Sequence, residues 1–147
     1  MSSSISSMIG VAAGLALAGT LVACVRPPPP APSGAEKRTE ITLLWAKIRD
    51  WRREAKMELD PTPQSLFAVK KMSVPEAKRV CPDGHEVPKT CSDVCDLADA
   101  ICDNAEAICT IAAELGPQDT FAQEKCTSAK ASCHESKQRC CDCSGDK

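Results

Sequence analysis

Apolar and polar positions in the C-terminal half of the chain repeat every seven residues, the period of a helix that packs against another helix. Two such stretches, residues 91–115 and 121–141, are separated by Gly116 and Pro117, which are residue types that end helices. A connection this short places two helices side by side and antiparallel. The pattern therefore predicts a helical hairpin.

A third amphipathic stretch lies upstream, at residues 41–59, and is ended by Pro61 and Pro63. Its predicted apolar side consists of Leu44, Ile48, Trp51, Ala55 and Leu59. The predicted hairpin leaves uncovered one stripe, made of Val94, Ile101, Ile108 and Leu115. We expect an all-α fold in which this helix covers that stripe. The alternative, a helix lying on anionic lipid, is disfavoured because acidic residues nearly balance the basic ones.

Cysteines occupy the positions where the two hairpin helices face each other. In an antiparallel hairpin, residues at one level have numbers with a constant sum, and three pairs share the sum 235: Cys95–Cys140, Cys102–Cys133 and Cys109–Cys126. A disulfide needs Cα atoms about 5.5–6 Å apart, which is closer than helices usually pack. The layers between the pairs are correspondingly small: Ala98 with Ser136, Ala105 with Ala129, and Ala112 with Ala122. The hairpin is therefore predicted to be a disulfide ladder.

The same register places Cys91 opposite Cys143, which leaves Cys81 and Cys141 for a fifth bond. The spacing alone also permits Cys81–Cys143 together with Cys91–Cys141. We predict Cys91–Cys143 and Cys81–Cys141 and keep the other pairing as an alternative. With Cys24 set apart, all ten remaining cysteines are then bonded.

The N-terminus has the organisation of an export signal, with a Ser-rich start and an apolar run over residues 9–23. It closes at Leu21-Val22-Ala23-Cys24, which resembles the bacterial lipobox. The resemblance implies that residues 1–23 are a lipoprotein signal peptide and that Cys24 is lipidated. The alternative is an uncleaved membrane anchor over residues 8–25.

Residues 24–40 are predicted to be a tether between this lipid and a single Cys-rich helical domain, residues 41–147. Its Pro-rich part, Arg26–Gly34, is typical of polyproline II, which extends about 3.1 Å per residue. Disulfides indicate an oxidising compartment. The lipoprotein resemblance, with Val25 rather than Asp after the lipidated cysteine, implies the outer membrane of a bacterial envelope.

Composition and charge fit a disulfide scaffold. Eleven cysteines stand in 147 residues, whereas aromatic residues make up only 3%, so a large apolar core is not available. Eighteen basic and 20 acidic residues give a net charge of −2, which argues against a nucleic-acid partner. Beside the seam, two ion pairs are predicted to support the same register: Asp99–Lys137 and Glu106–Lys130.

Thiols could instead bind copper or zinc. Heptad spacing separates successive cysteines on one helix by about 10.5 Å, so most levels offer only two sulfurs. Four ligands could gather only among the cysteines at one end: Cys91, Cys95, Cys140, Cys141 and Cys143. No motif for a catalytic triad, a phosphate-binding loop or a cofactor is present. We therefore predict no enzyme activity and no cofactor.

The block Leu44-Trp45-x-x-Ile48-Arg49-x-Trp51-Arg52, together with the cysteine spacing up to Cys143, resembles a group of cysteine-rich bacterial lipoproteins of uncharacterised function. The resemblance covers residues 41–143 and implies no activity or ligand. We expect a lipid-anchored structural or protein-interaction module of the cell envelope. Its expected partners are the membrane, through the lipid, and an unidentified envelope protein. A copper- or zinc-binding protein is the alternative.

Overall fold

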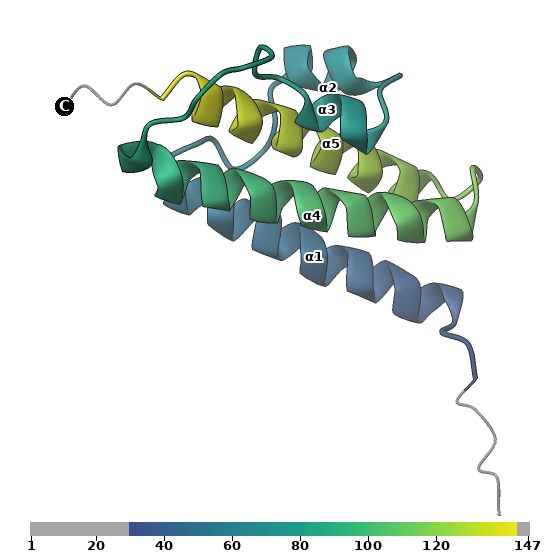
Figure 1. Cartoon of the computed structure of the whole chain (residues 1–147). Helices are drawn as coiled ribbons and strands as arrows, with labels where there is room; N and C mark the ends of the chain where they lie inside the picture. The colour runs from purple at the N-terminus through teal and green to yellow at the C-terminus, as the bar shows by residue number, and fades with distance from the viewer. Residues whose placement is uncertain (1–29, 144–147) are drawn as a thin grey trace, which may run out of the picture. The chain divides into compact units, whose positions relative to one another are not determined.

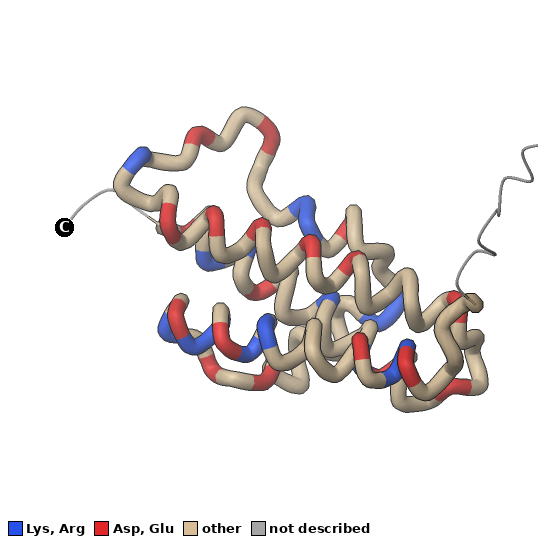
Figure 2. The backbone as a smooth tube through the Cα atoms, turned by 90° about the horizontal axis from the view of Figure 1, so that it is seen from below, with Lys and Arg blue, Asp and Glu red and all other residues tan. Residues whose placement is uncertain are grey.

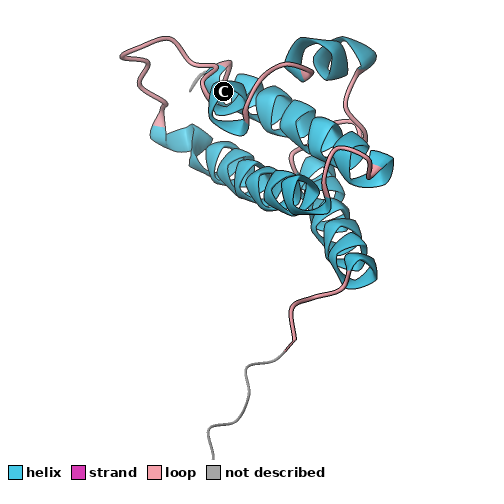
Figure 3. Cartoon of the chain, turned by 90° about the vertical axis from the view of Figure 1, so that its right-hand side faces the viewer, coloured by secondary structure: helices cyan, strands magenta, loops and turns pink. Residues whose placement is uncertain are grey.

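Helices account for all the regular secondary structure of residues 30–143, which are the residues that the computed structural model describes. The predicted signal peptide and Cys24 lie outside the described residues. The elements are α1 (Gly34–Glu54), α2 (Pro63–Val69), α3 (Val74–Lys78), a 3-10 turn (Lys89–Cys91), α4 (Ser92–Leu115) and α5 (Thr120–Cys141). Figure 3 shows these helices joined only by loops and turns. The predicted all-α class is correct.

Helices α4 and α5 form the predicted hairpin, with boundaries within one residue of those expected. Gly116 ends α4 with φ at +88°, a conformation that favours glycine. Asp119 caps α5 by accepting the N–H of Ala122 at 3.1 Å. We call the end with this turn the closed end and the end with Cys91 and Cys143 the open end.

Five disulfides hold the described part of the chain together: the four pairs that the register predicts and Cys81–Cys141, which was assigned as the remaining pair. The Cα–Cα distances are 4.5–4.9 Å in the three bonds of the ladder. The two outer bonds, Cys81–Cys141 and Cys91–Cys143, span 5.4 and 6.1 Å, and the structure thus contains this pairing rather than its alternative. Close facing Cα atoms require small neighbours, and Ala98, Ala105 and Ala129 are fully buried.

We expect Ala105→Leu to lower the free energy of unfolding by about 2 kcal/mol, because a larger side chain cannot fit between helices that disulfides hold together. The control is Ala113→Leu, an exposed position on the same helix, which should change it by less than about 0.5 kcal/mol. Chemical denaturation of the disulfide-intact variants measures both. Equal tolerance of the two leucines would contradict the packing described here.

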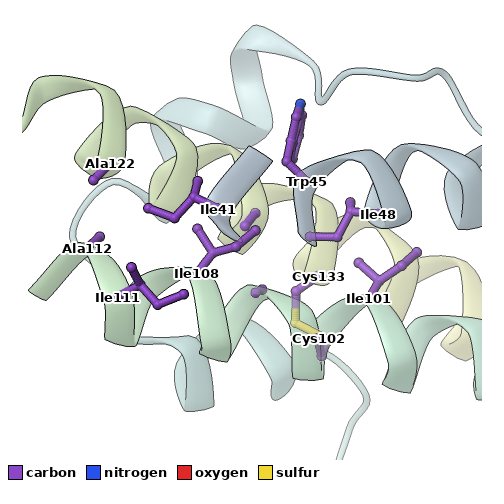
Figure 4. Close-up of a cluster of buried hydrophobic side chains, with 12 residues drawn as sticks. Ile41, Trp45, Ile48, Ile101, Cys102, Ile108, Ile111, Ala112, Ala122 and Cys133 are labelled. Carbon is purple, nitrogen blue, oxygen red and sulfur yellow. A yellow bond between two sulfur atoms is a disulfide. The ribbon is translucent and has the colours of Figure 1, made fainter. Parts of the chain in front are cut away.

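Helix α1 covers the apolar stripe of α4, as expected. Figure 4 shows Ile41 and Ile48 of α1 beside Ile108 and Ile101, and all four are fully buried. Ile41 and Ile48 are seven residues apart, as are Ile101 and Ile108. The equal spacing lets each isoleucine of α1 pack against one isoleucine of α4. Trp45 adds its ring to this cluster at 8% exposure.

The extent and the buried side of α1 differ from the prediction. The helix begins at Gly34 because Ser33 and Glu36 form a capping box, so residues 34–40 are helical rather than part of the tether. It ends at Glu54, and Lys56 then adopts φ of +56°, which turns the chain away. The buried side is centred on Ile41, Trp45, Ile48 and Arg52, whereas Leu44 and Trp51 lie at its edges.

Helices α2 and α3 pack against the other side of α5 (Figure 1). Lys130 is buried there and donates to the carbonyl of Met72 at 2.7 Å. The predicted Glu106–Lys130 ion pair is therefore wrong, and Glu106 instead pairs with Lys78 of α3 at 3.3 Å. The predicted Asp99–Lys137 pair is present. The sequence-based prediction missed this change of ion-pair partner because it considered only the two hairpin helices and not α3.

Candidate interaction groove

An open groove of about 880 Å³ lies at the open end of the hairpin. Its walls come from the start of α4, the last two turns of α5 and the connector between α1 and α2. The apolar stripe of α4 continues to Val94, one heptad beyond Ile101, whereas α1 ends at Glu54. Val94 and Met57 are consequently left partly exposed on the floor.

One wall of the groove is built on Arg52, which is not among the residues of the apolar side predicted for this helix. Its side chain is only 1% exposed. Nε donates to the carbonyl of Glu58 at 2.7 Å, and Nη2 donates to the carbonyl of Asp60 at 3.2 Å and to the carboxylate of Glu135 at 2.7 Å. One guanidinium therefore joins α1, the connector after it and α5.

Glu135 completes this network from α5. Its Oε1 accepts the backbone N–H of Thr62 at 2.9 Å and the Thr62 hydroxyl at 3.1 Å. Burial opposes ionisation of the carboxyl, but hydrogen bonds from Ser65, Thr62 and Arg52 outweigh it and hold the pKa of Glu135 below its ordinary value. The carboxylate thus fixes the start of α2 onto α5.

Acidification should weaken this network. Because the pKa of Glu135 is lower in the folded chain than in the unfolded chain, its contribution is complete above the unfolded value and is lost as pH falls through the folded one. We expect the free energy of unfolding to drop between about pH 5 and pH 3, and to drop less steeply in Glu135→Gln. Denaturant titrations across this range measure the slope. An unchanged slope in the variant would contradict the assignment.

Free polar side chains line the rest of the groove. His134, Gln138, Arg139 and Asp142 come from α5 and the residue after it, and Glu58 comes from the connector. None of these five side chains makes an ion pair with another described residue. The Cys91–Cys143 disulfide also lines the groove, with Cys143 partly exposed and Cys91 buried. The groove therefore combines an apolar floor with a charged rim.

The cysteines proposed as the alternative metal ligands are placed close together, but as disulfides. Cys91, Cys95, Cys140, Cys141 and Cys143 are all bonded, and bonded sulfurs are not thiolate ligands. Within residues 30–143, no group of three or more His, Cys, Asp or Glu side chains is positioned to hold a metal ion.

The sequence pattern missed the groove because it forms between segments far apart in the chain. A partial signal was present for Arg52, which continues the buried row of Ile41, Trp45 and Ile48 by one further turn. Its partner Glu135 lies 83 residues away. The lipidation site, Cys24, lies outside the described residues.

No family model, curated protein or solved structure matches this chain. The five disulfides indicate an oxidising, extracytoplasmic compartment. Among the helices of the described residues, none has the length and apolar character needed to cross a membrane.

Proposed function

We propose that this chain is a lipid-anchored module of the bacterial cell envelope that binds another envelope protein through the groove at its open end. The observation that carries the proposal is the use of all ten cysteines between Cys81 and Cys143 as cross-links. Because all ten sulfurs are in disulfides, these cysteines serve to make the domain rigid. The groove presents side chains for recognition rather than a reactive group. The proposal includes no catalytic activity.

The position of the tether favours this arrangement. Helix α1 begins at the closed end, where Lys37 pairs with Glu114 at 2.9 Å and Arg38 pairs with Asp119 at 2.8 Å. At about 1.5 Å per residue, its 21 residues extend about 31 Å toward the open end. A chain anchored through Cys24, as its resemblance to the lipobox suggests, would carry the groove at the end away from its attachment point.

A copper- or zinc-binding protein is the weaker alternative. It would require the cysteines at the open end to be reduced, and reduction would remove the bonds that hold this end together. The resemblance to cysteine-rich bacterial lipoproteins supports the envelope assignment and adds no metal. Free-thiol titration and metal analysis of the purified protein separate the two functions: stoichiometric metal with reduced cysteines would overturn our proposal.

Anchoring is tested at Cys24. We expect the mature N-terminal peptide to begin at Cys24 and to carry acyl chains, which mass spectrometry detects. Two or more chains give stable membrane attachment, so Cys24→Ala, in a chain whose residues 1–23 are replaced by a cleavable signal peptide of a non-lipidated protein, should appear in the soluble fraction instead of the membrane fraction. A mature protein without lipid, or a variant that stays membrane-bound, would contradict the proposal.

Binding through the groove is tested by site-specific photo-crosslinking in intact envelopes. A photoreactive amino acid replaces Gln138, which is exposed on the groove wall, or Ala46, which is exposed on α1. We expect one discrete crosslinked protein from Gln138→p-benzoylphenylalanine and none from the Ala46 control. The same products from both positions would indicate nonspecific contacts and would overturn the assignment of the groove.

A further inference from the structure

We propose that the groove takes a cationic polypeptide segment that inserts an apolar side chain between Met57, Val94 and the Cys91–Cys143 disulfide. This inference deepens the proposed function and rests on it, because it states the chemistry of the partner. It follows from the apolar floor, from the charge around the groove and from the position of the groove in the fold.

The floor accounts for the apolar part of the ligand. Val94 belongs to the same row as Ile101 and Ile108, which α1 covers fully. Helix α1 ends at Glu54, and the groove that Val94 lines is bordered by Arg52 from its last turn and by Met57 and Glu58 of the connector. An apolar side chain from another polypeptide would extend this packing by one level and would remove partly exposed apolar surface from water.

Charge selects a cationic partner. Residues 52–60, 83–96 and 134–143, which line or flank the groove, carry nine acidic and six basic residues. When the residues in ion pairs are left out, seven acidic and three basic residues remain. On the rim itself, Glu58 and Asp142 have no ion-pair partner among the described residues, and Arg139 is the opposing cation. Lysine or arginine side chains of a ligand would therefore find two free carboxylates on the rim.

Acidic residues continue along α4, so the negative charge around the groove extends along the hairpin (Figure 2). Toward the closed end its carboxylates are paired, because Asp99 pairs with Lys137 while Asp103 and Glu106 share Lys78, which leaves one negative charge uncompensated. Asp93 and Asp96, near the open end, make no ion pair with a described residue. Uncompensated negative charge is thus concentrated at the end of the hairpin that holds the groove, which favours encounter with a cationic segment.

The test uses the full-length lipidated protein in detergent micelles and two fluorescein-labelled peptides. One alternates lysine with leucine and serine, and the other has glutamate in place of lysine. Fluorescence anisotropy measures their dissociation constants at low and moderate salt. We expect the lysine peptide to bind at least about tenfold more tightly than the glutamate peptide and to weaken as salt is added.

Neutralising the rim tests the position of the site. Glu58→Gln combined with Asp142→Asn should weaken the lysine peptide about three- to tenfold, since each exposed ion pair contributes a few-fold in affinity. The matched control combines Glu40→Gln with Glu124→Gln, two exposed carboxylates away from the groove. It should change the affinity less than twofold. Equal losses from both pairs would show diffuse attraction to an acidic surface and would overturn the inference.

Val94→Asp distinguishes binding of an apolar side chain on the groove floor from attraction by charge alone. The position lies in the first turn of α4, where an aspartate is compatible with the helix, and disulfide mapping verifies the fold. A seated apolar side chain predicts at least about fivefold weaker binding of the lysine peptide, whereas attraction by charge alone predicts tighter binding. The second result, or no binding of the lysine peptide to the parent protein, would overturn the inference. Neither result alters the lipid state of Cys24 or a crosslink at Gln138, so failure here is distinguishable from failure of the proposed function.

Discussion

Reduction of the five disulfides is expected to unfold the domain at room temperature. Far-UV circular dichroism should show loss of most of the helical signal in a thiol-free phosphine reductant, and the cooperative thermal transition should disappear. The oxidised protein should keep both. The control is protein incubated with the oxidised form of the same reductant, which leaves the disulfides intact.

The first reason is geometric. Facing Cα atoms in the ladder lie 4.5–4.9 Å apart, a separation that bonded sulfurs allow. Two nonbonded sulfur atoms need about 3.6 Å between them instead of about 2 Å, so the reduced helices have to separate. The buried layers of Ala98, Ala105 and Ala112 are too small to fill the gap that would result.

The second reason is energetic. Apart from the sulfurs, the largest fully buried apolar side chains are four isoleucines and Val69, and the only buried aromatic side chain among the described residues is Trp45. Each disulfide contributes about 2–4 kcal/mol when considered alone, and nested bonds contribute less together than the sum. Even so, the total is comparable to the about 5–15 kcal/mol that stabilises an ordinary domain. A reduced chain that retained a cooperative transition would contradict this account.

Arg52→Met should lower the free energy of unfolding by about 3 kcal/mol. The substitution leaves the carboxylate of Glu135 without its guanidinium partner and frees the carbonyls of Glu58 and Asp60, and breaking a buried ion pair in this way typically costs about 3–5 kcal/mol. Chemical denaturation of the disulfide-intact protein measures the effect. It should appear without any loss of disulfide content.

The neighbouring residue supplies the matched control. Arg53 makes an exposed ion pair with Asp50 at 2.8 Å, and both side chains are more than half exposed. Arg53→Met should therefore change the free energy of unfolding by less than about 1 kcal/mol. If the two substitutions had equal effects, the buried network would not contribute as described. Adding Glu135→Leu to Arg52→Met should recover part of the loss, because it removes the unpaired carboxylate.

The ladder could be predicted from the sequence because independent patterns specified one register. Heptad spacing fixed the facing positions, the short connection around Gly116 fixed the antiparallel arrangement, and the small residues between the cysteines agreed with both. Each observation alone is compatible with other folds. Together they left little freedom, and this explains why even the two outer bonds were assigned to the pairs that the structure contains.

The start of α1 was missed for a local reason. Prolines dominate the residues before Ser33, and their composition suggested that the tether continued to residue 40, although Ser33 and Glu36 have the spacing of a capping box. Burial of Arg52 was missed for a nonlocal reason, because its partners belong to the connector and to α5. The groove is lined by Arg52 and by segments far apart in the chain, so it could not be located from the sequence pattern.

The order of the cysteines along the chain has a consequence for biosynthesis. A chain exported N-terminus first delivers Cys81, Cys91, Cys95, Cys102 and Cys109 before any of their partners, since every bond joins one of these five to a cysteine between Cys126 and Cys143. Any bond closed before Cys126 emerges is therefore non-native. Such bonds are corrected by thiol–disulfide exchange, which takes seconds to hours. The ladder can therefore close only after the start of α5 has emerged, and every earlier bond has to be exchanged before the native set is complete.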